Sequence, residues 1–592
     1  MIKLIKYLKP YWWQLLLVFI LVYIQVETDL KLPDYMAKII NEGIVAENNH
    51  LIFSTGLIML GVALIGAVGT IGVGYFAAKV STGLARDLRH KVFTKVESFS
   101  MQEFDKFSTA SLITRSTNDI QQIQMVIFMI LRIVVSAPMM GIGAIWKAYR
   151  VAPNMSWIIG LGVAILFSLI IFLFAIAINK FKLLQQVVDK LNQVTRENLT
   201  GLRVIRAFNR EKFEEKKFNQ TNRELTQLNL FVNRLMILMQ PMVMLIFNLT
   251  SVAIVWFGAK LINTDNLSIG NMMAFMQYAM QVIFAFLMLS MVFIMIPRAA
   301  VSGDRIAEVL DTKIKIKNPK SAKKFTATQK GVVEFKDVFF SYPNSDEPVL
   351  KAITFTALPG QTTAFIGSTG SGKSTLINLI PRFFDVSAGQ ILIDETDIRE
   401  VTLKALHDKI GYIPQKGILF SGTIADNIKY GAPDASEKAM TEAAAIAQAE
   451  TFINKLEDKF NSNIAQGGAN VSGGQKQRLA IARAIIKKPE IYIFDDSFSA
   501  LDFKTDAALR KALAKSIKNT TVLIVTQRIS TILNADKILV LDEGKIVGEG
   551  THLELMSNCK VYQEIAASQL SSEELAKEAK RLTNSQRKGD PS

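Results

Sequence analysis

The sequence contains little of the chemistry that builds disulfide scaffolds or zinc sites. Among its 592 residues one is cysteine, Cys559, and four are histidine. A single cysteine excludes a disulfide framework and a cysteine-ligated metal centre, and so few histidines argue against a zinc enzyme built on histidine ligands. Charged residues are also scarce, at 20% against roughly 25% in ordinary globular proteins.

Hydrophobic residues are abundant instead. They form 50% of the chain, and the mean hydropathy is +0.25. This composition is too apolar for an ordinary soluble enzyme, and it excludes disorder, collagen and coiled coil as descriptions of the whole chain. The net charge of +16 fits nucleic-acid binding, but a membrane protein acquires the same excess from cytoplasmic lysine and arginine. Charge alone therefore does not decide between the two.

Long apolar runs fill the first half of the chain, up to about Pro297. A helix needs ~20 mostly apolar residues to span a bilayer. Six runs reach this length: Trp12–Leu32, Leu57–Val80, Met125–Trp146, Trp157–Ile178, Met236–Leu261 and Met272–Ile296. Burying all six inside a soluble protein would need a polar shell that this half lacks. We therefore predict an α-helical membrane domain with six transmembrane helices over residues 1–302.

Basic residues set the expected orientation of these spans. The segments between the second and third spans and between the fourth and fifth are rich in lysine and arginine, and such segments stay in the cytoplasm. With six spans, the N-terminus and the C-terminal half are then cytoplasmic too. Residues 1–10 carry lysines before the first apolar run. We expect them to form a basic amphipathic helix on the membrane surface and not a cleaved signal peptide.

The two basic inner segments are too polar for lipid and too long for turns. Their apolar periodicity predicts membrane helices that continue into the cytoplasm, with tips near Phe104–Thr114 and Gly201–Phe213 that could dock on the soluble half. Free loops are the alternative. After a linker over 303–330, residues 331–570 have the composition of a soluble α/β domain. The polar tail over 571–592 is expected to form a short helix and then to be disordered.

The clearest chemical motif of the soluble half is a phosphate-binding loop. It matches the pattern G-x-x-x-x-G-K-[ST] at Gly367, Ser368, Thr369, Gly370, Ser371, Gly372, Lys373 and Ser374, and Thr375 follows. An apolar strand precedes the motif and an apolar helix follows it, which is the context that the motif requires. The glycines turn backbone N–H groups toward phosphates. Lys373 reaches the β- and γ-phosphates, and the Ser374 hydroxyl ligates magnesium.

A second apolar strand supplies a candidate magnesium ligand. This strand, Ile491–Phe494, ends in Asp495. A carboxylate at the end of a buried strand beside a phosphate loop holds magnesium, directly or through water. The alternative is an ordinary polar residue at a strand end. The sequence thus predicts ATP and Mg²⁺ as ligands of this domain.

A third motif consists of Val471, Ser472, Gly473, Gly474 and Gln475. Two glycines at a helix start form another anion cradle. Together with the phosphate loop, Asp495 and the six spans, this motif resembles the ATP-binding cassette (ABC) family, in its exporter class with a fused membrane domain. The resemblance covers the chain up to about residue 570. It implies an α/β P-loop ATPase domain of ABC type, two of which meet head to tail. Each ATP then lies between one chain's phosphate loop and the other chain's Ser-Gly-Gly-Gln.

The resemblance also implies roles for residues outside these motifs. Tyr342 matches the aromatic residue that stacks on adenine, and Gln415 matches the glutamine that senses magnesium, the attacking water and the membrane domain. Ser499-Ala-Leu-Asp502 matches the loop that crosses the dimer interface. Phe104–Asp119 and Glu197–Glu211 resemble the segments that couple the two domains.

Two residues depart from the family pattern. Asp496 stands where the family has a glutamate that polarises the attacking water, and Gln527 where it has a histidine that contacts the γ-phosphate. Aspartate is one methylene, ~1.5 Å, shorter than glutamate, and a misplacement of ~1 Å can slow a reaction ~100-fold. Glutamine carries no positive charge and relays no proton. Both changes are expected to spare ATP binding and to weaken hydrolysis.

The signature Ser472–Gln475 is undamaged and still fits a working site. The pattern resembles heterodimeric ABC exporters that have one degenerate and one competent ATP site. We therefore expect a second ABC half-transporter as partner, with glutamate and histidine at the equivalents of Asp496 and Gln527. A homodimer in which both changes are tolerated drift is the alternative.

The membrane half indicates less about the cargo. Phenylalanine and methionine, 36 and 22 in the chain, suit promiscuous apolar binding, although ordinary helix packing explains most of them. Glu27, Asp29 and Arg132 fall in spans or at their ends, where charge is costly and indicates function. The acidic pair could attract cationic amphiphiles, or it could lie at the outer interface and bind nothing.

By resemblance, we expect a multidrug exporter in a bacterial cell membrane, driven by ATP through alternating access. Its partners would be hydrophobic small molecules and the lipid bilayer. A lipid or peptide exporter is the alternative for the cargo, and a nucleotide-gated channel or regulatory subunit is the alternative for the activity. ABC proteins that act on DNA or ribosomes lack membrane spans, so no nucleic-acid partner is expected.

Overall fold

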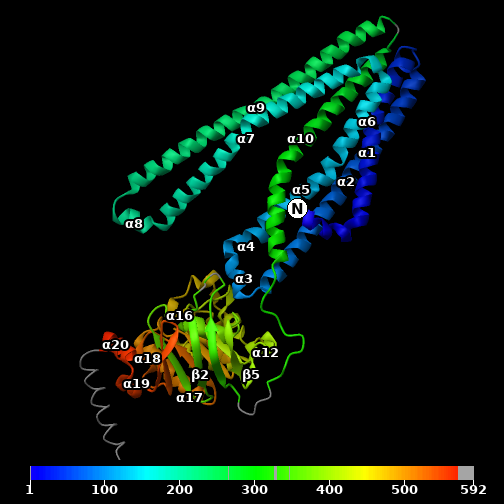
Figure 1. Cartoon of the computed structure of the whole chain (residues 1–592). Coiled ribbons are helices and arrows are strands. Elements are labelled where there is room, and N and C mark those ends of the chain that lie inside the picture. The colour runs from blue at the N-terminus through cyan, green and yellow to red at the C-terminus, as the bar shows by residue number, and fades with distance from the viewer. Residues whose placement is uncertain (1, 265, 326–329, 344, 346, 571–592) are drawn as a thin grey trace, which may run out of the picture. The chain divides into compact units, whose positions relative to one another are not determined.

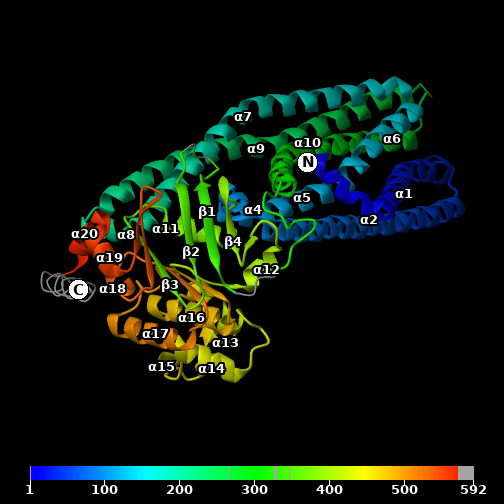
Figure 2. The same cartoon turned by 60° about the horizontal axis from the view of Figure 1, so that its bottom comes forward.

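The computed structural model describes residues 2–264, 266–325, 330–343, 345 and 347–570. They form two compact units (Figures 1 and 2). The first unit contains the chain up to Glu97 together with Thr109–Thr312, and the second contains Ser98–Ser108 together with the chain from Lys313 onward. The division follows the change from apolar to mixed composition along the sequence.

The first unit is helical throughout its described elements. These are η1 (Ile2–Tyr11), α1 (Trp12–Lys38), η2 (Ile39–Ile44), α2 (Asn49–Glu97), α4 (Thr109–Ser116), α5 (Asn118–Met129), η3 (Ile130–Val134), α6 (Ser136–Val151), η4 (Pro153–Met155), α7 (Ser156–Thr200), α8 (Leu202–Ala207), α9 (Glu211–Ile262) and α10 (Ile269–Asp311). The elements η2 and η3 are short π-helices.

Several helices of this unit are far longer than a membrane span. The helices α2, α7 and α9 have 49, 45 and 52 residues. At ~1.5 Å per residue each is roughly 70 Å or longer, against a bilayer core of ~30 Å. This length confirms the prediction that membrane helices continue beyond the apolar spans. The helices α7 and α9 run side by side, and α8 joins them at their tip (Figure 1).

Five stretches of the described residues are long and apolar enough to cross a membrane. They are Asn49–Glu97, Thr109–Val151, Pro153–Thr200, Glu211–Ile262 and Ile269–Ser290. Each contains, wholly or in part, one of the second to sixth predicted spans. The first predicted span, Trp12–Leu32, is helical within α1 but is not one of the five.

One carboxylate joins three helices of the first unit. The Tyr278 hydroxyl in α10 donates to Asp34 Oδ1 at 2.5 Å and to Leu30 O at 3.0 Å, both in α1. Lys147 Nζ in α6 pairs with Asp34 Oδ2 at 2.5 Å. The Tyr278 side chain is fully buried. These bonds hold α1, α6 and α10 together in an environment where an unpaired charge would be costly.

The described residues of the second unit form three sheets. Its strands are β1 (Val333–Phe340), β2 (Leu350–Ala357), β3 (Thr362–Gly367), β4 (Ala388–Ile393), β5 (Thr396–Asp397), β6 (Ile410–Ile413), β7 (Gly422–Thr423), β8 (Asn463–Ile464), β9 (Ile491–Asp495), β10 (Thr521–Val525), β11 (Lys537–Asp542) and β12 (Lys545–Gly550). The largest sheet has the order β12-β11-β3-β10-β9-β6, and β2-β1-β4-β5 and β7-β8 form the other two.

The described residues of the second unit also form helices. They are α3 (Met101–Lys106), α11 (Lys373–Leu379), α12 (Leu403–Asp408), α13 (Ile424–Lys429), α14 (Glu437–Ile446), α15 (Glu450–Ile453), η5 (Lys459–Asn461), η6 (Gln466–Gly468), α16 (Gly473–Ile486), α17 (Phe503–Ser516), α18 (Ile529–Ile532), α19 (His552–Asn558) and α20 (Lys560–Gln569). The helices α13 to α17 lie together on one side of the unit (Figure 2).

The parallel strands of the six-stranded sheet, β6, β9, β10, β3 and β11, are mostly buried on both faces, as their apolar sequences predict. Alternate residues of β9 point to opposite faces. Phe494 packs into one hydrophobic core with residues of α13 to α17. Ile493 packs into a second core with Leu376 of α11 and with residues of β1 and β2. All five residues of β9 are buried. This burial fixes the strand whose end carries Asp495.

The first residues of the linker predicted over 303–330 are helical. The helix α10 continues to Asp311, because its helical pattern is unbroken past residue 302. On the other side of the linker, Asp394 Oδ1 accepts hydrogen bonds from the backbone of Gly331 and Val332 at 2.6 and 2.9 Å. Asp394 also pairs with Lys409, at 2.8 Å. The predicted tail, 571–592, lies outside the described residues.

Candidate nucleotide site

The six-stranded sheet gathers the predicted site residues at one edge. The strands β6, β9, β10, β3 and β11 are mutually parallel neighbours. The carboxyl ends of parallel strands meet at the same edge, which is where open α/β sheets bind ligands. The phosphate loop follows β3, Asp495 ends β9, and Gln415 and Gln527 stand two residues beyond the ends of β6 and β10. Residues more than 150 positions apart in the chain are thus brought together.

The phosphate loop has the backbone that only glycine adopts easily. Gly370 and Gly372 have φ of +87° and +97°, in the left-handed region that disfavours side chains. A Cβ on Gly372 would also lie 2.8 Å from Leu350 Cδ2. The loop leads into α11, whose first residue is Lys373. A helix N-terminus directs free N–H groups and a partial positive charge at an anion.

Lys373 folds back over this loop. Its Nζ donates to Gly367 O at 2.9 Å, to Ser368 O at 2.6 Å and to Ser371 Oγ at 3.3 Å. Burial lowers the pKa of Lys373, and the nearby carboxylates of Asp496 and Asp495 partly offset that effect. The lysine is therefore a buried cation held directly beside the loop that would receive phosphates.

Ser374 and Asp495 form the candidate magnesium site. The Ser374 hydroxyl donates to Asp495 Oδ1 at 3.0 Å. Burial raises the pKa of Asp495, and the hydrogen bond from Ser374 lowers it in part. A divalent cation beside this carboxylate would reduce the cost of burying its charge. One carboxylate and one hydroxyl suit Mg²⁺, which keeps several waters and binds phosphate oxygens. The described residues contain no cluster of three metal-ligating side chains, so an all-protein metal cage is not formed by them.

Asp496 and Gln415 also lie close together. Gln415 Nε2 lies 3.4 Å from Asp496 Oδ2. Asp496 has φ of +44°, an uncommon conformation that surrounding bonds impose. Its N–H donates to Val525 O at 2.8 Å, and its carbonyl accepts from Ser499 Oγ at 2.8 Å. The backbone at Asp496 is therefore fixed on both sides.

The structure adds residues that no motif marks. The Ser497 hydroxyl, fully buried, donates to Ile413 O at 2.9 Å and so ties β9 to the end of β6. Gln569, at the end of α20, donates to Gln527 O at 2.6 Å and accepts from Ile529 N at 3.0 Å. It thereby holds the loop that presents the exposed Gln527 side chain. The sequence around single polar residues such as Ser497 and Gln569 does not indicate that they make these contacts.

Tyr342 lies against the phosphate-loop helix. Its hydroxyl is 3.0 Å from Thr375 Oγ1, and its ring makes edge contacts with Phe340 and Phe384 at centroid distances of 5.0 and 5.5 Å. These contacts place an aromatic ring next to α11, where a bound nucleotide's base could reach it.

The signature motif lies at the start of α16, where the free N–H groups of the helix N-terminus could bind an anion. Ser472 Oγ accepts from Gln475 N at 3.3 Å, and Gln475 Oε1 accepts from Ser472 N at 2.8 Å, a reciprocal cap of the helix. A Cβ on Gly473 would meet no atom within 4 Å, so this position is open. A Cβ on Gly474 would lie 3.2 Å from Ala500 O. The signature and the loop ending in Asp502 are therefore neighbours.

The predicted coupling segments contain the short helices α4 and α8, and the end of α3 overlaps the first of these segments. The helix α3 belongs to the second unit, where Glu103 Oε1 accepts from Lys315 N at 3.2 Å. The helix α8 is short and exposed, and none of its residues is buried. Leu202 and Val204 are 44% and 61% exposed there, so α8 presents apolar side chains at its surface.

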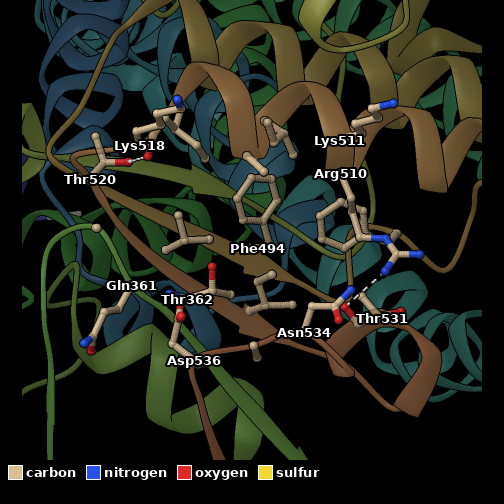
Figure 3. Close-up of a pocket in the computed structure, with 18 of the residues that line it drawn as sticks. Gln361, Thr362, Phe494, Arg510, Lys511, Lys518, Thr520, Thr531, Asn534 and Asp536 are labelled. Atoms are coloured by element: carbon tan, nitrogen blue, oxygen red, sulfur yellow. Dashed lines mark hydrogen bonds between the residues drawn. The ribbon is translucent and has the colours of Figure 1, made fainter. Parts of the chain in front are cut away.

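Two cavities lie away from the nucleotide edge. One, of about 610 Å³, lies beneath α17 in the second unit (Figure 3). Phe494 stands at its centre, while Thr362 and Thr520 mark the amino ends of β3 and β10, opposite the phosphate loop. The other, of about 800 Å³, lies in the first unit and is lined by Arg132. Glu27 and Asp29 are not among its lining residues.

A phosphate-loop ATPase unit joined to long membrane-type helices defines an ATPase of the transport class. Comparison with known proteins makes this specific. Residues 15–303 match the family model of the ABC transporter transmembrane region, and residues 350–499 match the ABC transporter model. The chain therefore belongs to the ABC transporter family and carries both regions in one polypeptide.

Relatives cover nearly the whole chain. An uncharacterized ABC transporter ATP-binding protein of Mycobacterium tuberculosis is 41% identical over 567 residues, covering 95% of this chain and 97% of the relative. One of Bacillus subtilis is 36% identical, covering 96% and 99%. An ATP-dependent lipid A-core flippase of Haemophilus ducreyi is 30% identical, covering 96% and 98%.

A solved structure of a bacterial Atm1-family ABC exporter with ATP bound shares the fold. Its TM-score is 0.77 at 24% identity, covering 94% of this chain and 98% of that one. The chain thus has the ABC exporter fold, with a helical membrane domain and an ATPase domain that binds ATP. It is an ABC transporter with the exporter fold.

Proposed function

We propose that this chain is one half of a multidrug exporter whose cargo is hydrophobic small molecules. The observation that carries the proposal is the gathering of the phosphate loop, Asp495, Asp496 and Gln415 at one sheet edge, in a chain that also has long apolar helices. The membrane domain spans 1–302, the linker 303–330 and the ATPase domain 331–570. The N-terminus and the ATPase domain face the cytoplasm of a bacterial cell.

At this chain's own phosphate loop, Lys373 binds the nucleotide phosphates, and Tyr342 stacks on the base. Ser374, Asp495 and Gln415 hold Mg²⁺, which would neutralise phosphate charge when bound. Asp496 orients the attacking water, but its carboxylate is one methylene short. Gln527 supplies a hydrogen bond and no positive charge. We therefore propose that this site binds ATP and hydrolyses it poorly.

The signature of this chain completes the competent site. Val471–Gln475 presents the N-terminus of α16 to an ATP held on a partner's phosphate loop, and Asp502 lies in the adjoining interface loop. The open position at Gly473 and the intact cap at Ser472 support this role. The partner is a second ABC half-transporter with glutamate and histidine at the equivalents of Asp496 and Gln527.

ATP binding at both sites closes the two ATPase domains, and the coupling segments pass this closure to the membrane helices. Hydrolysis at the competent site then resets the transporter. The degenerate site keeps its ATP longer and shifts the equilibrium between inward-facing and outward-facing states. The sequence also predicts cationic amphiphiles as cargo, from Glu27 and Asp29. Neither lines the membrane cavity, so we propose hydrophobicity, and not positive charge, as the shared property of the cargo.

A lipid exporter is the second candidate, because a relative that covers the chain is a lipid A-core flippase. The test is ATP-dependent transport into inside-out vesicles that contain the chain with and without its partner. Uptake of hydrophobic dyes against a gradient supports drug export. Movement of labelled lipid between leaflets without dye uptake supports the lipid alternative. Passive flux that ATP merely gates would indicate a channel and refute both.

A further inference from the structure

The cavity of the first unit combines apolar side chains with one charged side chain, Arg132, among its described lining residues. It lies among α1, α2, α5, η3, α6 and α10 and has a volume of about 800 Å³, within the range that suits a small-molecule ligand. Much of the wall is flexible or aromatic: Phe128, Met129, Met140, Met280, Phe284 and Met288. Side chains of this kind adapt to apolar ligands of different shape. The same wall carries one positive charge, Arg132, and none of its described lining residues is acidic.

Arg132 lies deep along its helical stretch. It precedes Lys147 by 15 positions, which is about 22 Å along a helix at ~1.5 Å per residue. Lys147 has a carboxylate partner in Asp34. The Arg132 side chain is exposed, and its guanidinium has no hydrogen bond or ion pair among the described residues, whereas its carbonyl accepts from Ser136 Oγ at 2.6 Å. A guanidinium without a counter-ion at membrane depth is costly to keep and marks a functional position.

Local backbone geometry supports a functional role for Arg132. It is the central residue of the π-helix η3 (Ile130–Val134). Such single-turn π segments inside α-helices are rare and occur frequently at functional sites. Among the described lining residues, the charged one, Arg132, thus stands where the chain departs from regular α-helix.

A second polar group in the wall lacks a partner. Gln281 Nε2 donates to Asp29 O at 3.1 Å. Its Oε1 is buried and has no hydrogen-bond partner among the described residues. A buried acceptor left unpaired is costly, and a hydroxyl or amide donor of a ligand would satisfy it. Gln25 and Gln277 line the same cavity.

We propose that this cavity selects amphiphiles with an acidic head group. The Arg132 guanidinium would hold a carboxylate or phosphate ester through paired, charge-assisted hydrogen bonds. Gln281 Oε1 would accept from a hydroxyl or amide near that head group, and the methionine and phenylalanine wall would cover the apolar chain. A cationic head group is disfavoured at this position because Arg132 would repel it. The proposal refines the cargo of the proposed function and rests on that function for transport.

The test compares two probes in the assembled transporter, reconstituted in nanodiscs of phosphatidylcholine. One probe is an eleven-carbon fatty acid with a dansyl amide at its far end, and the other has trimethylammonium in place of the carboxylate. We expect the wild type to bind the acid at least about 10-fold more tightly, because hydrogen bonds to charged groups are worth that factor or more. Arg132→Gln should weaken acid binding about 10- to 100-fold and leave the ammonium probe unchanged or improved. Arg132→Lys should recover part of the loss, since it keeps the charge without the planar fork.

Arg150→Gln is the matched control. Arg150 ends the same helical stretch and stacks on Trp146 at 3.7 Å from the ring centroid, and it does not line the cavity. Its removal should leave acid binding unchanged. Equal binding of the acid by wild type and Arg132→Gln would overturn the proposal. A preference of the wild type for the ammonium probe would also overturn the proposal, and this comparison does not depend on the folding of any variant.

Competition identifies the source of the head group. If phosphatidylglycerol added to the nanodiscs displaces the acid probe, the site is assigned to an acidic bilayer lipid. If it does not displace the probe, the site is assigned to a single-chain amphiphile. Both results support an acidic head group. Transport is scored separately: tight acid binding without ATP-driven movement would refute the proposed function and leave the cavity's selectivity standing. ATP-driven movement of both probes at equal rates would support the proposed function and refute the selectivity of the cavity for acidic head groups.

Discussion

Replacing Asp496 by glutamate should restore hydrolysis at this chain's own phosphate loop. The structure holds the Asp496 backbone between Val525 and Ser499, with bonds of 2.8 Å on either side. The main chain therefore cannot advance to compensate for the shorter side chain. The added methylene moves the carboxylate by ~1.5 Å. Since a misplacement of ~1 Å can cost ~100-fold, we expect Asp496→Glu to raise ATP turnover at this site about 10- to 100-fold.

Gln527→His should add to this gain. The Gln527 side chain is exposed, and Gln569 holds its backbone carbonyl at 2.6 Å. A histidine can therefore take the same position without a change in the loop. It supplies a donor that can be charged and can relay a proton, which glutamine cannot.

The assay is Mg²⁺-dependent ATP turnover by the chain purified alone, repeated after co-expression with the product of the neighbouring gene. Asp496→Asn is the control, since it keeps the length and removes the negative charge, and it should lower the residual rate. The reasoning would be refuted by an Asp496→Glu variant no faster than the wild type. It would equally fail if the wild-type chain alone matched the rate of the co-expressed pair, because Asp496 and Gln527 would then suffice in a homodimer.

Three further results are expected. Lys409→Met should lower the free energy of unfolding of the second unit by ~3–5 kcal/mol, because it leaves the buried Asp394 carboxylate with its two backbone hydrogen bonds but without a cation; urea unfolding measures this. Gly473→Val should keep the thermal stability, since its Cβ meets open space, yet cut turnover of the assembled pair at least ~10-fold by blocking the anion-facing helix start. The hydrogen bond from Thr505 N lowers the pKa of Asp502. The ionised Asp502 therefore stabilises the fold at pH values above its unfolded pKa of ~3.9, and this stabilisation is lost as the pH falls through the lower pKa of the folded state. Asp502→Asn keeps a hydrogen-bond acceptor, so the melting temperature of this variant should fall less than that of the wild type between pH 5 and pH 3.

Much of the nucleotide site was predictable because its chemistry depends on short motifs. The loop at 367–374 has glycines where φ is positive, and the strand before it and the helix after it are apolar. Asp495 could be placed beside Ser374 because parallel strands end at one edge, and their 3.0 Å bond confirms that proximity. The helical spans followed from length and composition in the same way.

Other contacts could not be predicted because each depends on one residue from a distant element. Nothing local to Gln569 indicates that it holds the Gln527 loop, and nothing local to Lys409 indicates that it pairs with Asp394. In the membrane unit the helices are apolar all round, so the sequence does not show which face lines a cavity. Arg132 reaches the cavity, whereas Glu27 and Asp29 do not line it, and only the packing of α1 against its neighbours decides this.

The strand order of the large sheet also has a consequence for synthesis on the ribosome. The strand β3, which carries the phosphate loop, is flanked by β10 and β11, and these strands follow it by about 155 and 170 residues. At ~5–20 residues per second, β3 waits roughly ten to thirty seconds for its partners. During that time a strand that is almost entirely buried in the folded unit has two unpaired edges. Ribosome-bound chains that stop before Thr521 should therefore bind chaperones or aggregate, while chains extended past Gly550 should become protease-resistant in one step.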